Sequence, residues 1–239
     1  MLGTMICVVM YTSPVRAVME ARRRYSLGSL NAIPFGLALV NAMSWSMYGI
    51  MLEDYYIFIA NGPGVVCGAY CVVSSLVIMG RESDTSLTEI KFRVLEGLLL
   101  GGISFFMLLG MLVGITMSSW DRDAKALVVA LIANTACVMY YGAPCTSMYN
   151  VIMTQDSSSL LLPMIFVNFL NAILWTVYGY FALKDMFVVV PNGIGLCLSM
   201  LQLGLIAVYP SSKKAGESKG DSPSVLYNKL CDDDDNNDI

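Results

Sequence analysis

Long uncharged stretches dominate the chain. Asp, Glu, Lys and Arg are missing from residues 30–52, 55–80, 97–120, 126–155, 157–183 and 186–212. Each stretch exceeds the ~20 mostly apolar residues with which a helix crosses a bilayer. The pattern predicts six long membrane-spanning helices.

A shorter apolar stretch, residues 1–15, precedes them. It is too brief for a full span, and it lacks the basic start and the small-residue cleavage site of a signal peptide. We interpret it as a truncated first helix, which brings the expected number of spans to seven. Residues 211–239 are polar and end in an acidic run, so we expect a disordered acidic cytosolic tail there.

Composition supports a lipid environment, because 56% of the 239 residues are hydrophobic and only 13% are charged. The 7 cysteines are scattered without the paired spacing of a metal site or a disulfide framework. The cysteines therefore predict no metal site. We also expect no cofactor, no enzymatic activity and no nucleic-acid partner. The expected partners are the lipid bilayer and a small neutral solute, and a homo-oligomer remains open.

Basic residues indicate the orientation, since Lys and Arg favour the cytosolic side of a membrane. With the N-terminus outside, eleven of the 14 fall inside: Arg16, Arg22, Arg23, Arg24, Arg81, Lys91, Arg93, Lys213, Lys214, Lys219 and Lys229. Three fall outside: Arg122, Lys125 and Lys184. This distribution predicts a cytosolic C-terminus and requires seven spans. We expect the plasma membrane, with the vacuolar or another endomembrane as the alternative.

One motif recurs along the chain. Residues 41–49 and 171–179 share Asn-Ala-x-x-Trp-x-x-Tyr-Gly at an offset of 130. Offsets of 129 to 131 also relate Pro14 to Pro144, Pro34 to Pro163, Asp54 to Asp185, and Asn61-Gly62 to Asn192-Gly193. Matches at a nearly constant offset indicate an internal repeat. A belt of Trp and Tyr at the membrane interface is the simpler alternative, but it does not explain Asn in the middle of both spans.

The repeat divides the chain into two units, residues 1–80 and 125–210, joined by a loop and a linker helix within residues 81–124. Two three-span units joined directly would be inverted, and one extra span makes them parallel. Parallel bundles with a pathway between them are an arrangement used by transporters.

With these motifs, the chain resembles the SWEET family of sugar transporters from about residue 3 to residue 209. Its specific signs, strong in combination, are Ser13-Pro14-Val15, Pro34 with the run from Trp45 to Gly49, Asn61-Gly62, and Pro191-Asn192-Gly193. The resemblance implies an all-α membrane protein whose seven transmembrane helices form two parallel three-helix bundles, and it implies sugar transport.

A sugar ring needs neutral hydrogen-bonding groups around its edge and flat apolar surfaces against its faces, which Asn and Trp supply. The resemblance implies a pocket made by Asn61, Asn192, Trp45, Trp175, Asn41 and Asn171. Buried asparagines also join membrane helices, which is the alternative role for Asn41 and Asn171. Family positions for size selection correspond to Met10 and Tyr140. Both are bulky, so we expect a monosaccharide such as glucose.

Two gates are also implied by the resemblance. The inner gate or hinge consists of Pro14, Pro34, Pro144 and Pro163, each expected to remove a backbone hydrogen bond and permit a bend. Tyr48 and Asp185 correspond to the outer gate, with Tyr178 and Asp54 as their repeat mates.

No Asp, Glu, Lys or Arg lies within the six long runs, and the chain has no His. Proton coupling normally requires such a group inside the membrane, so we expect a bidirectional facilitator (uniporter) working by alternating access. The alternatives are a transporter for another small solute with a related repeat, or a non-transporting assembly partner if the first helix is short. A seven-helix receptor would not need the repeat.

Overall fold

The computed structural model describes residues 2–28, 30–81, 86–116 and 119–210. The tail expected to be disordered, residues 211–239, lies outside this part. Eight α-helices and two π-helices are present in the described part: α1 (Leu2–Arg24), α2 (Ile33–Leu52), α3 (Tyr55–Met79), α4 (Ser86–Met111), η1 (Leu112–Thr116), α5 (Arg122–Tyr140), α6 (Gly142–Thr154), α7 (Leu162–Tyr178), η2 (Gly179–Leu183) and α8 (Met186–Val208).

Seven helical segments in the described residues are long and apolar enough to span a membrane, as expected. The fifth combines α5 and α6, and the fourth and sixth continue into η1 and η2. The first span is longer than its apolar run, because α1 continues through the basic residues to Arg24 and reaches 23 residues. Lys and Arg do not oppose a helix, and at its C-terminal end their charge interacts favourably with the helix dipole.

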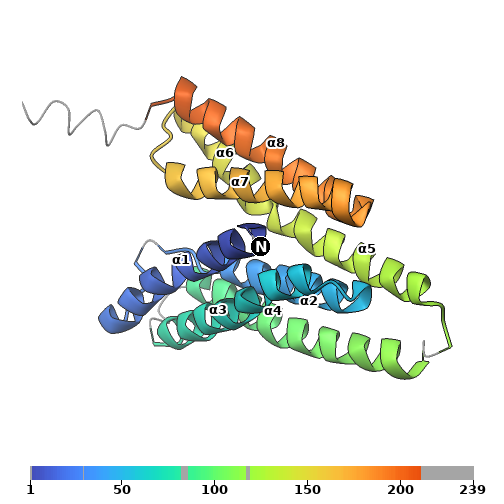
Figure 1. Ribbon diagram of the computed structural model, residues 1–239. Coiled ribbons are helices and arrows are strands. Elements are labelled where there is room, and N and C mark those ends of the chain that lie inside the picture. Colours follow the sequence, from blue (N-terminus) through green and yellow to red (C-terminus); the bar gives the residue numbers. More distant parts are fainter. Residues whose placement is uncertain (1, 29, 82–85, 117–118, 211–239) are drawn as a thin grey trace, which may run out of the picture.

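The helices pack as two groups with the same internal order (Figure 1). In the first group α3 lies between α1 and α2, and in the second α8 contacts α5, α6 and α7. The third span of each repeat is therefore the central one. The linker helix α4 packs on α2 and α3 of the first group. The most extensive contacts between the groups are those of α2 with α5 and of α1 with α7, and these two pairs are exchanged by the repeat.

Proline positions differ from the expectation at two sites. Pro34 and Pro163 stand within the first two residues of α2 and α7, where the backbone N–H has no partner inside the helix. They begin these helices and do not break a ladder of hydrogen bonds. The expected bend through a lost interior bond is therefore wrong for this pair.

The other two prolines differ from each other. The first span remains one helix through Pro14, and Ser13 Oγ donates to the Met10 carbonyl that Pro14 leaves free (3.0 Å). The fifth span is divided at Tyr141, three residues before Pro144, into α5 and α6. Only the second repeat has a broken first span among the described residues.

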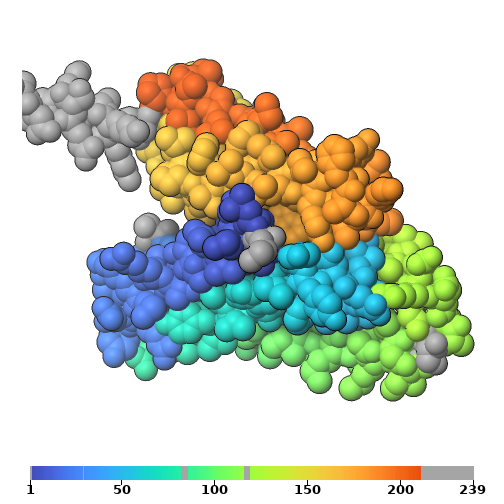
Figure 2. Space-filling model, in the orientation of Figure 1, coloured from blue at the N-terminus to red at the C-terminus, as the bar shows by residue number. Residues whose placement is uncertain are grey.

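Both groups meet in one buried core near the turns that carry Asp54 and Asp185. It contains residues from six helices: Cys7, Trp45, Tyr48, Ile57, Ala60, Val129, Ala130, Ala133, Trp175 and Val188. We call this the Asp54–Asp185 end of the molecule. The opposite end, where α1 and α8 finish, is the Arg24–Val208 end. Side chains from both groups fill the first end, and Figure 2 shows the surface indented between the groups toward the second.

Candidate functional site

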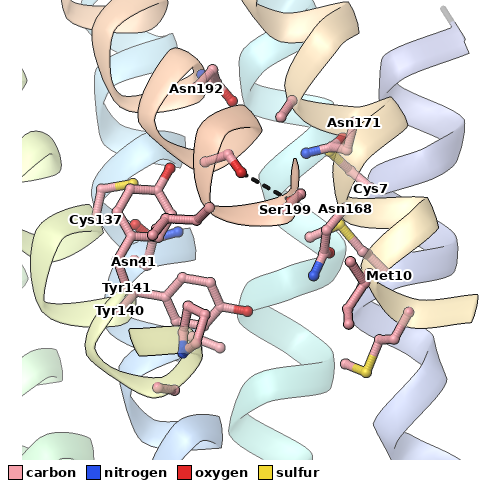
Figure 3. Close-up of a pocket in the computed structure, with 18 of the residues that line it drawn as sticks. Cys7, Met10, Asn41, Cys137, Tyr140, Tyr141, Asn168, Asn171, Asn192 and Ser199 are labelled. Atoms are coloured by element: carbon pink, nitrogen blue, oxygen red, sulfur yellow. Dashed lines mark hydrogen bonds between the residues drawn. The ribbon is translucent and has the colours of Figure 1, made fainter. Parts of the chain in front are cut away.

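A cavity of about 340 Å³ lies between the two groups of helices. It reaches from the paired tryptophans Trp45 and Trp175 toward the Arg24–Val208 end, where Pro34, Gln202 and residues 159–161 line it. The volume falls at the lower end of the range of small-molecule sites. Figure 3 shows side chains from several helices pointing into this space.

All eight residues expected to contact a substrate line the cavity: Met10, Asn41, Trp45, Asn61, Tyr140, Asn171, Trp175 and Asn192. They come from six helices in two repeats, and the interface between the groups brings them together. Of the expected hinge prolines, Pro34 and Pro144 line the cavity, whereas Pro14 and Pro163 are not among its lining residues.

The two tryptophans lie against the core side of the cavity, each with only 8% of its surface exposed. Trp175 Nε1 donates to Cys7 Sγ (3.3 Å), and the Cys7 thiol donates to Asn171 Oδ1 (3.1 Å). These two hydrogen bonds connect α1 of the first repeat to α7 of the second. It holds the indole in one orientation and leaves the Asn171 amide group as a donor.

A tyrosine from each repeat lies against the third span of the same repeat. Tyr11 O–H donates to Asn61 Oδ1 (3.0 Å), and Tyr141 O–H donates to the carbonyl of Pro191 (2.5 Å). The Asn61 side chain also donates to the Ile57 carbonyl (2.9 Å). Both contacts orient the helix segment that presents a candidate sugar-binding asparagine.

Glycine permits this approach in both repeats. A Cβ added at Gly64 would lie 2.7 Å from the Tyr11 ring, and one added at Gly195 would lie 2.8 Å from Tyr141 Oη. Such distances are too short for any real side chain, so glycine is required while the tyrosines stay in place. The Asn-Gly-x-Gly motif thus combines an asparagine for the cavity with a glycine for the tyrosine.

Two tyrosine–carboxylate hydrogen bonds close the cavity at the Asp54–Asp185 end. Tyr48 O–H donates to Asp185 Oδ2 (2.5 Å), and Tyr178 O–H donates to Asp54 Oδ2 (2.6 Å). Each bond joins one repeat to the other, and the repeat exchanges the two. The expected outer-gate pair is therefore in contact, and so is its repeat mate.

Each of these carboxylates also caps a helix. Asp54 Oδ1 accepts from the Ile57 N–H (2.8 Å) at the start of α3, and Asp185 Oδ1 accepts from the Phe187 N–H (2.8 Å) at the start of α8. A negative charge is favoured at a helix N-terminus, and the capping bond fixes the side-chain rotamer. The second oxygen is thereby presented to the tyrosine of the other repeat.

Neutral groups alone line the described part of the cavity, with no Asp, Glu, Lys or Arg among them. Asn41 Oδ1 is buried without a hydrogen-bond partner from the described residues. Asn192 uses its amide group on the Val188 carbonyl (2.8 Å), which leaves its oxygen as an acceptor. The site can therefore exchange hydrogen bonds with the hydroxyls of a ligand, and it offers no counter-charge to an ion.

Several lining residues were missed by the sequence reasoning. Tyr11 and Tyr141, like Cys7 and Cys137, recur at the offset of 130, so extending the repeat through the first spans could have found them. Asn168, Ser199 and Gln202 also line the cavity. Their repeat mates have different chemistry, so no repeat signal marks these three.

Comparison with known proteins gives consistent matches. A family profile described as "Sugar efflux transporter for intercellular exchange" matches residues 1–82 and 127–214, one match for each repeat. "Sugar transporter SWEET1" of Caenorhabditis elegans is 27% identical over 205 residues, 85% of this chain and 62% of the relative. The chain thus spans less than two thirds of the nematode protein.

"Bidirectional sugar transporter SWEET17" of Arabidopsis thaliana is 24% identical over 220 residues, 92% of this chain and 87% of the relative. Among solved structures, that of a eukaryotic SWEET transporter matches with a TM-score of 0.73 at 22% identity. The match covers 87% of this chain and 93% of that one. The expected fold of two three-helix bundles joined by a linker helix is thereby confirmed.

Proposed function

Because this chain belongs to the SWEET family of sugar transporters, we propose that it carries a neutral sugar across a membrane in both directions without coupling to an ion gradient. The observation that carries this proposal is the cavity between the repeats. It is lined by asparagines and tryptophans, it lacks charged side chains among the described residues, and it is closed at one end by paired tyrosine–carboxylate bonds.

Paired residues would hold the sugar. Asn61 and Asn192 carry amides at equivalent places on α3 and α8, and Trp45 and Trp175 present indole rings from opposite groups. A hydroxyl on the edge of the ring would donate the hydrogen bond that Asn41 Oδ1 lacks. Because a buried polar atom without a partner is costly, a hydrogen bond from the sugar to Asn41 Oδ1 would favour binding.

In alternating access, the two ends of the cavity would open and close in turn. The hydrogen bonds at the Asp54–Asp185 end join one repeat to the other, and breaking both would let the groups separate there. At the Arg24–Val208 end, residues of α2, α6 and α7 would close the cavity in the opposite state. The fifth span is already divided at Tyr141, next to Pro144, which makes it the more deformable wall.

Orientation follows from the basic residues. We place the N-terminus outside and the C-terminus in the cytosol, in the plasma membrane with an endomembrane as the alternative. The cavity then opens to the cytosol. Met10 and Tyr140 narrow it from opposite repeats, which supports a monosaccharide such as glucose.

The test is uptake of radiolabelled glucose and sucrose by vesicles containing the purified protein. We expect glucose to equilibrate at the same final level with or without an imposed pH gradient. Asn192→Ala should reduce the initial rate at least tenfold, while Asn150→Ala, an exposed asparagine on α6, should not. Accumulation above equilibrium driven by pH would contradict the uncoupled mechanism, and sucrose transport without glucose transport would contradict the size assignment.

A further inference from the structure

The polar residues of the cavity lie at two depths. Near the tryptophans they come in repeat-related pairs, Asn41 with Asn171 and Asn61 with Asn192. Closer to the Arg24–Val208 end the cavity is lined by Asn168 of α7 and Gln202 of α8. In Figure 3, Asn168 lies between Asn171 and Met10.

The two amides lie at matching depth. Helices α7 and α8 pack against each other and run antiparallel from the turn at Asp185. Asn168 is 17 residues before Asp185 and Gln202 is 17 residues after it. Asn168 is also three residues from Asn171, which is about 4.5 Å along a helix. The pair is thus about one helical turn closer to the open end than Asn171.

This pair near the open end has no counterpart in the first repeat. At the offset of 130 Asn168 corresponds to Ala38, and at the offset of 131 Gln202 corresponds to Cys71. Ala38 lines the opposite wall of the cavity, and Cys71 is buried away from it. Folding of a repeat therefore does not require an amide at either place.

Neither amide has a partner within the described residues. Gln202 is only 7% exposed, lines the cavity and makes no hydrogen bond there, and Asn168 makes none either. The neighbouring Ser199, by contrast, donates to the Gly195 carbonyl (2.9 Å). Gln202 is buried and Asn168 is half-buried, and both line the cavity. A ligand or water in the cavity can therefore supply the hydrogen bonds that these two amides lack.

We propose that Asn168 and Gln202 form a second sugar-binding position, through which the sugar passes between the paired Asn–Trp site and the open end of the cavity. This inference rests on the proposed sugar transport. Each amide offers one acceptor oxygen and two donor hydrogens, which suits neighbouring hydroxyls. The apolar Met10 and Ala38 of the first repeat line the cavity as well and suit the C–H faces of the ring.

The Asn168–Gln202 position should affect transport in one direction only. It is available only while the cavity is open at the Arg24–Val208 end, so it strengthens binding of sugar that arrives from that side. Loss of the position should raise the half-saturation concentration for sugar leaving the cytosol. In a passive carrier the ratio of maximal rate to half-saturation concentration must be equal in both directions. Since the influx values should stay unchanged, this ratio is fixed, and the maximal efflux rate should rise by the same factor as the half-saturation concentration.

The experiment measures influx and efflux of labelled glucose into an empty opposite compartment. It compares the full wild-type chain, Asn168→Leu with Gln202→Met, and the control Asn150→Leu. We expect the double variant to raise the efflux half-saturation concentration about five- to tenfold, as expected for lost hydrogen bonds. Its influx constant should stay within about twofold of wild type, which also shows that the protein is folded and the paired site intact.

Four other results are informative. An unchanged efflux constant means that only water fills the position, and it overturns the inference. An equal rise in both directions overturns it too, because the residues then act in the paired site. Loss of sucrose transport with glucose unaffected assigns them to one extended site for a disaccharide, against the proposal. A wild-type chain that moves no sugar refutes the proposed function and this inference with it.

Discussion

The tyrosine–carboxylate bonds allow a quantitative prediction. Replacing Tyr48 or Tyr178 by Phe removes one hydroxyl and leaves the ring, which packs near a tryptophan with centroids 5.9 Å and 5.6 Å apart, respectively. Asp54 and Asp185 keep their capping bonds, so α3 and α8 should still begin at the same residues. The substitution therefore changes the contact between the repeats and little else.

The size of the effect follows from the chemistry of the bond. A hydrogen bond to a charged group is worth about 1.5–3 kcal/mol, which corresponds to a factor of about 10 to 150 in an equilibrium. Each single variant should shift the equilibrium by that factor away from the state that is closed at the Asp54–Asp185 end. If the two bonds act independently, the double variant should combine both shifts.

The assay uses Cys7, a buried thiol of the cavity next to Trp175. A membrane-impermeant thiol reagent is added from the Asp54–Asp185 side, and peptide mass spectrometry measures modification of Cys7 alone. We expect faster modification in Tyr48→Phe and Tyr178→Phe, and faster still in the double variant. Tyr180→Phe is the matched control, because Tyr180 is exposed.

The modification rate of Cys7 can refute this reasoning. If Cys7 reacts at the wild-type rate in the double variant while the protein remains folded, the two bonds do not hold the cavity closed. Packing of the buried core at this end would then be sufficient for closure.

Three further predictions concern individual contacts. Gly195→Ala should displace Tyr141, at a cost of about 1–3 kcal/mol, and should lower both the thermal midpoint in detergent and sugar affinity; an unchanged midpoint would contradict the close approach. Asn134→Leu removes the amide that donates to the Phe187 carbonyl (3.2 Å). This carbonyl has no partner within its own helix, because proline stands four residues later. The substitution should therefore destabilise the protein by about 0.6–1.7 kcal/mol in a reversible unfolding assay. Arg122→Ala removes an exposed ion pair to Glu53 (3.1 Å) and an exposed hydrogen bond to the Met51 carbonyl (3.2 Å). It should change the thermal midpoint little, since exposed ion pairs are worth about 0–1 kcal/mol; a large loss would show that Arg122 holds α2 to α5.

Much of this protein could be predicted from its sequence. A charge-free run of sufficient length must become a helix in lipid, because unpaired backbone groups are costly there. The recurrence of Asn, Trp, Tyr and Gly identified two equivalent units, and equivalent units place matching residues at one interface. The family resemblance carried by these motifs named the eight candidate pocket residues, and the structure places all of them around one cavity.

Other features depended on the tertiary structure. Pro34 and Pro163 belong to helix starts, which the sequence does not distinguish from kinks because proline is suited to both places. Asn168 and Gln202 lie in no repeated motif, and only the antiparallel packing of α7 and α8 brings them to one depth. Their polarity alone would fit a surface or a helix contact equally well.

The seven spans, the two parallel units and the neutral chemistry between them follow from the order of the residues. Which end of the cavity is closed depends on how the two groups of helices pack. The repeat is symmetric under exchange of the two groups, so it is equally compatible with a cavity open at either end. Two hydrogen bonds between the groups, those of Tyr48 with Asp185 and Tyr178 with Asp54, favour one state. A free-energy difference of a few kcal/mol between two states cannot be seen in the pattern of residues.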